Sequence, residues 1–549
     1  MAARPSPVPG SASSSRMMDR HFPTAGTAAA PSPAAMDAPA TKRAAPVDRP
    51  GTAAAPYFLK NGVLYREQRH VMQGRGAAAM RTLIRGGLVL SMDERIGRLP
   101  QGDVLVEDDR ILAVGPALEA PDAAVIGAEG CLVLPGLVNA HLHTWQTALR
   151  AIGGDWTSAD YFRIMHGVLG PRYQPEDLRV GTLVGALAQL DAGVTTLFDW
   201  CHGNATPEHT DAALDGLLDS GIRAVFGHGT VKPQPRPGEP HFSEVPHPAA
   251  EIRRLRTTRL AADTARVTLA ACILGPDYST MDVCRADFAL AREYGLLSSA
   301  HVWGNTNRLV PEGYRRLAEE GLLGPDHNLV HGTYLGEEEL RVIVESGVSV
   351  TSTAAAEVKG NAREPLSCRV AALGGAPSIA PDTELLNGGG MLDCMRAALQ
   401  LHRLFNNQHI VARQQAQPAA AAAQEIATSG SPITAVSLTH EAVLRWATIN
   451  NARALRLDHR IGSLTPGKQA DLIIVRRDSL GMIGAREPVQ ALIHFAQAAD
   501  IRDVMAGGRL LKQDGRLLHP GLAAEKARLL ASGDRLLAGT GLPGAAGQG

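Results

Sequence analysis

The sequence predicts an α/β protein: a (β/α)8 barrel with a small β-sandwich domain built from both flanks of the barrel. Eight apolar stretches alternate with amphipathic helical stretches over roughly 270 residues, the size expected of such a barrel. Short alternating runs separated by turn residues precede and follow this repeat, a pattern typical of antiparallel strands. No Gly-x-Gly-x-x-Gly motif follows a strand candidate, so a doubly wound open sheet is the less favoured alternative.

The chain divides into a biased N-terminal region, the barrel with its flanks, and a C-terminal segment. Residues 1–79 are dominated by Ala, Pro, Ser and Thr, a composition that cannot bury a core, so we expect a disordered tail there. A second biased insert, at 414–431, should form a surface loop or a frayed helix. The other expected units are the sandwich at 80–130 and 462–520, the barrel at 131–461, and a helix or tail at 521–549.

The barrel strands are expected where the chain is apolar, and the outer helices where it is amphipathic. Four of the expected helices are Pro175–Asp191, Pro207–Ser220, Met281–Tyr294 and Glu337–Glu345. The strand candidates are 131–134 leading into His141, then 194–199, 222–228, 267–274, 296–301, 328–331, 347–353 and 377–382.

Composition narrows the class of protein. The 549 residues are 45% hydrophobic and 20% charged, with a net charge of −1, as in an ordinary globular enzyme. The lack of a basic surplus argues against nucleic acid, and the lack of a charge block or an 18-residue apolar run argues against a membrane. Six cysteines without a Cys-x-x-Cys pair suit a reducing compartment, so we expect a cytoplasmic protein. Its partner should be a small-molecule substrate, with a homodimer or higher homo-oligomer left open.

The most informative stretch is a histidine pair, His141 and His143, which follows the break Pro135-Gly136. Residues i and i+2 of a strand point to the same side, so both imidazoles can face one point. Two nitrogens that face one point suit a metal ion.

Further polar side chains stand where other barrel strands end, and the carboxyl ends of barrel strands carry the chemistry. We predict a metal site formed by His141, His143, His301 and Asp382, with an open position for water. Three or four nitrogen and oxygen ligands suit zinc, and iron or another divalent metal is an alternative. The remaining polar residues at strand ends are Asp199, His202, His228 and His331.

The run from Pro135 to His143, with His301, His331 and Asp382, resembles the amidohydrolase superfamily. The branch it is most similar to contains cytosine deaminase and the chlorohydrolase-like triazine hydrolases. Residues 447–455 resemble the helix that follows the family's barrel, and residues 461–472 resemble its return into the small β-domain. The resemblance covers about residues 80–520.

This resemblance implies that His141, His143, His301 and Asp382 hold one metal. Asp382 would also act as the base, and His331 would orient the metal's water or the substrate, which makes Asp382 and His331 the expected catalytic residues. Two-metal members bridge their ions with a carboxylated lysine from the fourth strand, which here contains none. We therefore expect one divalent ion, zinc in preference to iron.

One residue departs from the family pattern. Deaminases of this branch usually place a glutamate three residues after the fifth-strand histidine, where this chain has Gly304. A replacement acid would have to come from Glu357, Asp199 or His202. A leaving group that needs little protonation, such as chloride, thiolate or an activated amine, would tolerate the loss.

Substrate contacts are expected in the loops at the strand ends. Four of the five tryptophans fall there, Trp156 among them, which suggests a flat apolar or aromatic ligand; the alternative is that they pack under loops. We expect His166, His209, His241, His247 and His327 on the surface. The expected substrate-binding residues are Trp145, Gln146, Trp200, His228, Trp303 and Glu357.

These features together predict a metal-dependent amidohydrolase. It would use metal-activated hydroxide to cleave a C–N bond, of an amine or an amide, in a small cyclic or heteroaromatic substrate. The alternatives are a dechlorinase or other leaving-group hydrolase on the same site, and a catalytically silent metal-binding barrel.

Overall fold

The structure is a computed structural model that describes residues 57–60, 63–66, 79–232, 235, 237–304, 308–361 and 363–544. The chain forms two units, Met1–Ala54 and Ala55–Gly549, and every described residue belongs to the second. Most of the predicted disordered tail therefore lies outside the described residues. Within it, Tyr57–Lys60 (β1) and Val63–Arg66 (β2) differ from that expectation, because they form an antiparallel pair that joins a sheet through β5.

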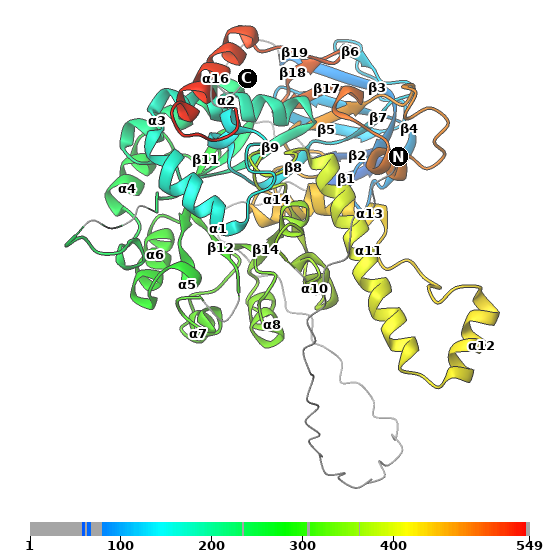
Figure 1. The fold of residues 1–549 in the computed structure, drawn as a ribbon. Coiled ribbons are helices and arrows are strands. Elements are labelled where there is room, and N and C mark those ends of the chain that lie inside the picture. The colour runs from blue at the N-terminus through cyan, green and yellow to red at the C-terminus, as the bar shows by residue number, and fades with distance from the viewer. Residues whose placement is uncertain are drawn as a thin grey trace, which may run out of the picture. The chain divides into compact units, whose positions relative to one another are not determined.

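The predicted (β/α)8 barrel is confirmed. Its eight parallel strands pair in chain order, and a bridge between Leu142 and Asp382 links the first strand to the segment after the last (Figure 1). The strands are β8 (Leu137–Leu142), β9 (Val194–Cys201), β10 (Arg223–His228), β11 (Val267–Ile273), β12 (Leu297–Val302), β13 (His327–His331), β14 (Ser349–Ser352) and β15 (Ser378–Ile379).

The outer helices begin and end at residues suited to those positions. Helix α2 (Pro175–Asp191) has proline in its first turn, where no intrahelical donor is lost, and a capping box between Gln174 and Asp177. Helix α3 (Pro207–Ser220) ends at Gly221, whose φ of 74° is the left-handed conformation that glycine adopts freely. The other outer helices are α4 (Ala249–Thr257), α6 (Met281–Glu293), α7 (Gly313–Glu319), α8 (Glu337–Glu345) and α10 (Leu366–Ala372).

The structure corrects our first barrel strand. Residues 132–134 belong to β7 (Leu132–Pro135), which pairs with β16 (Leu472–Val475) and β3 (Arg81–Leu90) in a second sheet. The first barrel strand, β8, begins only after Gly136. A Cβ at Gly136 would overlap the Thr195 side chain, so the chain can cross between the two sheets here only as glycine.

Both flanks of the barrel contribute to this second sheet, which has eleven strands. Side chains from the two flanks meet in one apolar cluster that includes Ile84, Val104, Val133, Leu472 and Met505. The remaining strands of the sheet are β4 (Arg98–Glu107), β5 (Arg110–Gly115), β6 (Ala124–Gly127), β17 (Ile501–Ala506), β18 (Arg509–Gln513) and β19 (Arg516–Leu517).

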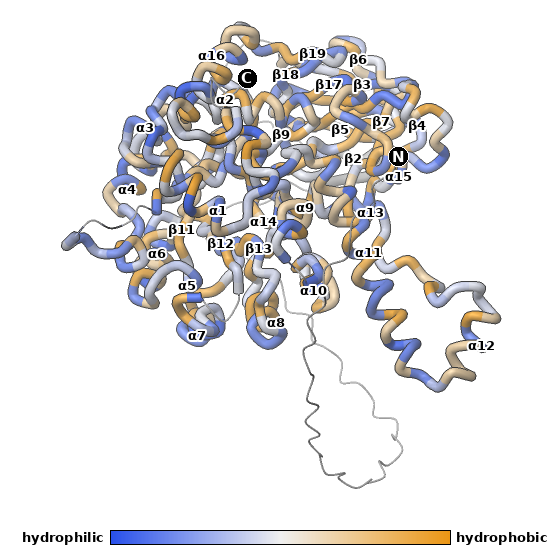
Figure 2. The backbone as a smooth tube through the Cα atoms, in the orientation of Figure 1, coloured by the Kyte–Doolittle hydropathy of each residue, from blue (hydrophilic) through white to orange (hydrophobic). Residues whose placement is uncertain are grey.

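Two helical segments extend this core. Helix α16 (Leu522–Leu537) packs on α2, where the Ser532 hydroxyl donates to Asp177 at 2.7 Å. Helices α11 (Met391–Gln415) and α12 (Ala419–Ser429) project from the barrel (Figure 1). Most of the biased insert at 414–431 is helix α12, which has no buried residue. Hydrophilic and hydrophobic stretches alternate along α11 in Figure 2. Among the described residues, no helix is both long and apolar enough to cross a membrane.

A buried ion pair joins the barrel to the second sheet. Arg223 at the start of β10 donates from Nε and Nη2 to Asp471 at 2.9 and 3.1 Å, and both side chains are 3% exposed or less. Asp471 also accepts the backbone N–H of Gly507 at 2.6 Å. This buried bidentate ion pair therefore connects two sheets whose strands are distant in sequence.

We expect Arg223→Met to lower the stability of the chain by about 3–5 kcal/mol, because it leaves the Asp471 carboxylate buried without its cation. Thermal and denaturant unfolding would measure the change. The control is Arg285→Met, which breaks an exposed pair with Glu320 and should leave the unfolding midpoint nearly unchanged. Equal midpoints for the two variants would contradict this role.

Candidate metal centre

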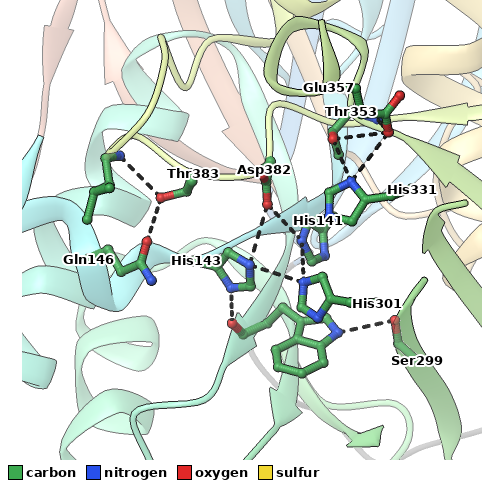
Figure 3. A network of polar contacts seen from close by, with 12 residues as sticks. His141, His143, Gln146, Ser299, His301, His331, Thr353, Glu357, Asp382 and Thr383 are labelled. Atoms are coloured by element: carbon green, nitrogen blue, oxygen red, sulfur yellow. Dashed lines mark hydrogen bonds and ion pairs between the residues drawn. The ribbon is translucent and has the colours of Figure 1, made fainter. Parts of the chain in front are cut away.

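Four side chains from three barrel segments meet at one point (Figure 3). His301 Nε2 lies 3.3 Å from both His141 Nε2 and His143 Nε2, and Asp382 Oδ1 lies 3.2 Å and 3.4 Å from the same two nitrogens. Zinc–ligand bonds of about 2.0–2.1 Å in a tetrahedron place the ligand atoms about 3.3 Å apart. The structure thus brings the four predicted metal ligands close enough together to bind a single ion.

The protonation of these groups also fits a divalent cation. The His143 Nδ1–H donates to the Trp200 carbonyl at 2.6 Å, which leaves the lone pair of Nε2 facing the centre. Burial lowers the pKa of His141 to about 3, so its imidazole is neutral. Burial raises the pKa of Asp382, but contacts with His141 and His143 outweigh this and hold its pKa well below the usual range. Neutral imidazoles and a carboxylate form a donor set that a divalent cation satisfies.

The backbone at this site is held in an unusual conformation. Asp382 has a φ of 78° and His331 a φ of 69°, both in the left-handed region that side chains rarely adopt. Two backbone hydrogen bonds fix Asp382. The Asp382 N–H donates to the His141 carbonyl at 3.3 Å, and the Asp382 carbonyl accepts the His143 N–H at 3.0 Å. Strain of this kind, on the order of 1–3 kcal/mol per residue, persists where the surrounding structure enforces it.

His331 stands beside the four ligands and is tied to a buried carboxylate. One of its ring nitrogens lies within 4.8 Å of the ligand atoms of His141, His301 and Asp382. Its Nδ1 lies 2.9 Å from Thr353 Oγ1 and 3.3 Å from Glu357 Oε1. Burial lowers the pKa of His331, but Glu357 and Asp382 outweigh burial and raise it.

Glu357 is 7% exposed and belongs to the short helix α9 (Ala354–Glu357). Its carboxylate also accepts the Thr353 N–H at 2.8 Å and the Ser352 hydroxyl at 3.1 Å. Glu357 is therefore a fixed partner of His331, with its charge directed at the imidazole.

A cavity of about 850 Å³ opens beside the metal centre, a size typical of small-molecule sites. Aromatic side chains and titratable groups line it among the described residues. The aromatic ones are Trp156, Tyr161, Phe162, Tyr278 and Trp303, and the titratable ones include His166, His202, Lys232, His331, Glu357 and Asp382. Trp303 and Glu357 therefore lie where the sequence placed substrate contacts.

The other four expected substrate contacts do not line this cavity in the described part of the chain. Trp145 is 2% exposed and packs on Tyr173. Gln146 accepts the Thr383 hydroxyl at 2.6 Å, and Trp200 lies behind His301 with ring centroids 4.2 Å apart. His228 contacts His247 at 3.0 Å between ring nitrogens.

We interpret these four as supporting residues beneath the cavity floor. Sequence position identifies the end of a strand but does not show whether a side chain there faces the cavity or the packed interior.

Some residues that line the cavity were not predicted from the sequence, and others were predicted to lie elsewhere. Tyr161, Phe162 and His166 come from α1 (Ser158–Tyr161) and a π-helix at Phe162–Leu169, a feature often found at functional sites. The adjacent aromatic pair Tyr161-Phe162 in the first β–α loop was the available signal. His166 lines the cavity, and His247 and His327 are buried, so our expectation that they lie on the surface is wrong.

The position of the missing glutamate is closed to any side chain. Gly304 has a φ of 79°, and a Cβ there would lie 2.6 Å from the backbone nitrogen of Leu335. Its N–H and that of Trp303 donate to Asp277 at 2.8 and 2.6 Å, which fixes the turn. Of the three candidate replacement acids, Asp199 bonds to Thr144 and does not line the cavity in the described part of the chain, whereas His202 and Glu357 do.

Comparisons with known proteins identify relatives in sequence and in fold. A sequence model of the Amidohydrolase family matches residues 132–511. The 8-oxoguanine deaminase of Pseudomonas aeruginosa is 30% identical over 466 residues, which cover 80% of this chain and 95% of that protein.

Two solved structures share the fold. A triazine hydrolase variant has a TM-score of 0.69 at 21% identity, covering 83% of this chain and 99% of that one. An adenosine deaminase from Xanthomonas campestris with bound zinc has a TM-score of 0.66 at 22% identity, covering 83% and 98%.

We expect His301→Ala to lose most of its bound metal while the barrel stays folded, because the variant removes one of four ligands. Elemental analysis of the purified protein and its circular dichroism spectrum would measure the two effects. His409→Ala, on the exposed face of α11, is the matched control and should keep the wild-type metal content. Full metal content in His301→Ala would refute the assignment.

Proposed function

Because this chain belongs to the Amidohydrolase family, we propose that it is a metal-dependent hydrolase that removes an amino group from a heteroaromatic ring. The observation that carries this proposal is the close approach of the donor atoms of His141, His143, His301 and Asp382 beside an aromatic-lined cavity. The Pseudomonas aeruginosa relative is named for deamination of a purine base, which supports the same class of reaction.

We further propose one ion, with zinc preferred over iron. Four protein donors and one water would give a single ion five ligands, a coordination number that catalytic zinc sites can reach. A second ion would need a bridging group, and β11 contributes none, since its sequence VTLAACI contains no lysine. Neutral imidazoles with one carboxylate suit both metals, and the zinc in a structural neighbour favours zinc.

The ion, when bound, makes hydroxide available near neutral pH by lowering the pKa of water to about 7. The residues around it then move protons. Asp382 is ionised and can take the proton released as water adds to the ring carbon. The two protons of the water end on the ring nitrogen beside the attacked carbon and on the departing ammonia, and the carbon keeps the oxygen as a carbonyl group.

A proton donor for the leaving amine must replace the glutamate that Gly304 excludes. His331 is suited to this role because Glu357 holds its Nδ1 and stabilises the protonated ring, which leaves Nε2 as the nitrogen that can deliver a proton. His202 lines the same cavity, but burial lowers its pKa well below the usual range and makes it a poor proton carrier. We assign proton delivery to the His331–Glu357 pair.

A second candidate function follows from Gly304. Without the usual glutamate, leaving groups that need no proton, such as chloride, fit the same site. A panel of aminopyrimidines, aminopurines, triazines and N-acyl compounds, assayed for ammonia, amine and chloride release, separates the candidates.

We expect metal-dependent ammonia release from at least one ring amine in this panel. Chloride release alone would favour the second candidate. Turnover by a metal-free preparation would overturn both, and silence with full metal loading would favour a non-catalytic barrel.

We expect Glu357→Gln to lower kcat by about 10²–10⁴-fold while the metal content stays unchanged, because the amide cannot stabilise the imidazolium of His331. Steady-state kinetics with the best substrate of the panel, paired with elemental analysis, would measure this. Glu338→Gln, at an exposed position of α8, is the matched control. Wild-type turnover in Glu357→Gln would exclude the pair as the proton donor.

A further inference from the structure

The cavity wall contains a buried cation that the proposed reaction does not use. Lys232 follows β10, is 8% exposed and lines the cavity. Its ammonium lies 5.6 Å from the ring centre of Phe162 and 5.1 Å from that of Tyr278. Lys232 and His301 line the same cavity, so the ammonium faces the same space as the candidate metal centre.

No carboxylate pairs with Lys232 in the described part of the chain. The two buried acids of the cavity are engaged elsewhere, Asp382 with the ligand histidines and Glu357 with His331. The other lysine of the wall, Lys359, differs, because it donates to the Gly153 carbonyl at 2.5 Å and has Asp155 and Asp160 near its charge.

A buried ammonium without an acid loses hydration that contacts with aromatic rings replace only in part. Burial lowers the pKa of Lys232 to about 8, so the side chain is still mostly charged at neutral pH. The rings of Phe162 and Tyr278 pack on each other with centroids 6.0 Å apart, and the ammonium lies beside both. The cavity therefore presents positive charge next to two aromatic rings.

We propose that Lys232 binds a carboxylate on the substrate, so that the enzyme acts on aminated heteroaromatic acids. The inference rests on the proposed function for the reaction and adds the substrate class. The aromatic faces of Phe162 and Tyr278 would contact the ring system while the ammonium pairs with its carboxylate. The cavity of about 850 Å³ lies in the upper part of the usual range of about 300–1,000 Å³, which leaves space for a substituted ring.

The test uses metal-loaded full-length protein and matched pairs of compounds that differ only in a carboxylate. Suitable pairs are pterin and pterin-6-carboxylate, cytosine and 5-carboxycytosine, and 2,4-diamino-1,3,5-triazine and its 6-carboxylate. Binding is read as the shift in melting temperature with ligand concentration, and turnover as ammonia release. The variants are Lys232→Met, Lys232→Arg, Lys359→Met and the exposed control Lys526→Met on α16.

We expect wild type to bind the acid of at least one pair tenfold or more tightly than its neutral partner. Lys232→Met should reduce that ratio at least tenfold, and Lys232→Arg should retain most of it. Lys359→Met and Lys526→Met should keep the wild-type ratio. If wild type binds the acid more tightly but releases no ammonia, the proposed reaction fails while the anion site stands.

Two results would overturn the anion site. One is the absence of any pair in which wild type prefers the acid. The other is a preference that survives in Lys232→Met or disappears in Lys359→Met.

Discussion

The close approach of three imidazole nitrogens and one carboxylate oxygen is the constraint on which the rest of this site depends. Lone pairs held 3.2–3.4 Å apart out of water repel one another unless a cation lies among them. The barrel maintains this arrangement by placing the donors at the ends of β8 and β12 and in the segment after β15, and by holding Asp382 in a left-handed conformation through two backbone hydrogen bonds. The ion that relieves the repulsion is also the source of the chemistry.

The barrel follows from sequence because it rests on local periodicity, whereas the ligand set remains a prediction from the polar residues at strand ends and from the family resemblance. Helices α2, α3 and α8 have the expected bounds, since an amphipathic pattern and a proline or glycine at the ends specify a helix almost alone. The boundary between β7 and β8 could not be found in this way. Both strands are buried and apolar, and only the close contact of Gly136 with Thr195 shows that the chain changes sheets there.

The cavity wall was harder to predict than its floor. Trp145 and Trp200 were expected to contact the substrate, but they are buried, Trp145 against Tyr173 and Trp200 against His301, because the side chains near a strand end divide between the cavity and the interior. Much of the wall comes instead from residues 154–162 and 356–361, and His166 of the π-helix and Lys232 of the loop after β10 add to it. Loop conformation depends on contacts distant in sequence, so residues such as Lys232 become candidates only once the loops are placed.

Two features in or near this wall bear on its charge. Gly304 stands where deaminases of the branch that the sequence resembles usually have a glutamate, and the backbone there leaves no space for one. Lys232 places an ammonium in the wall without an acid partner in the described part of the chain. A carboxylate in the wall would repel an anionic substrate, and an unpaired ammonium attracts one. Both features, although separate in sequence, would therefore favour the carboxylate-bearing substrate that we propose.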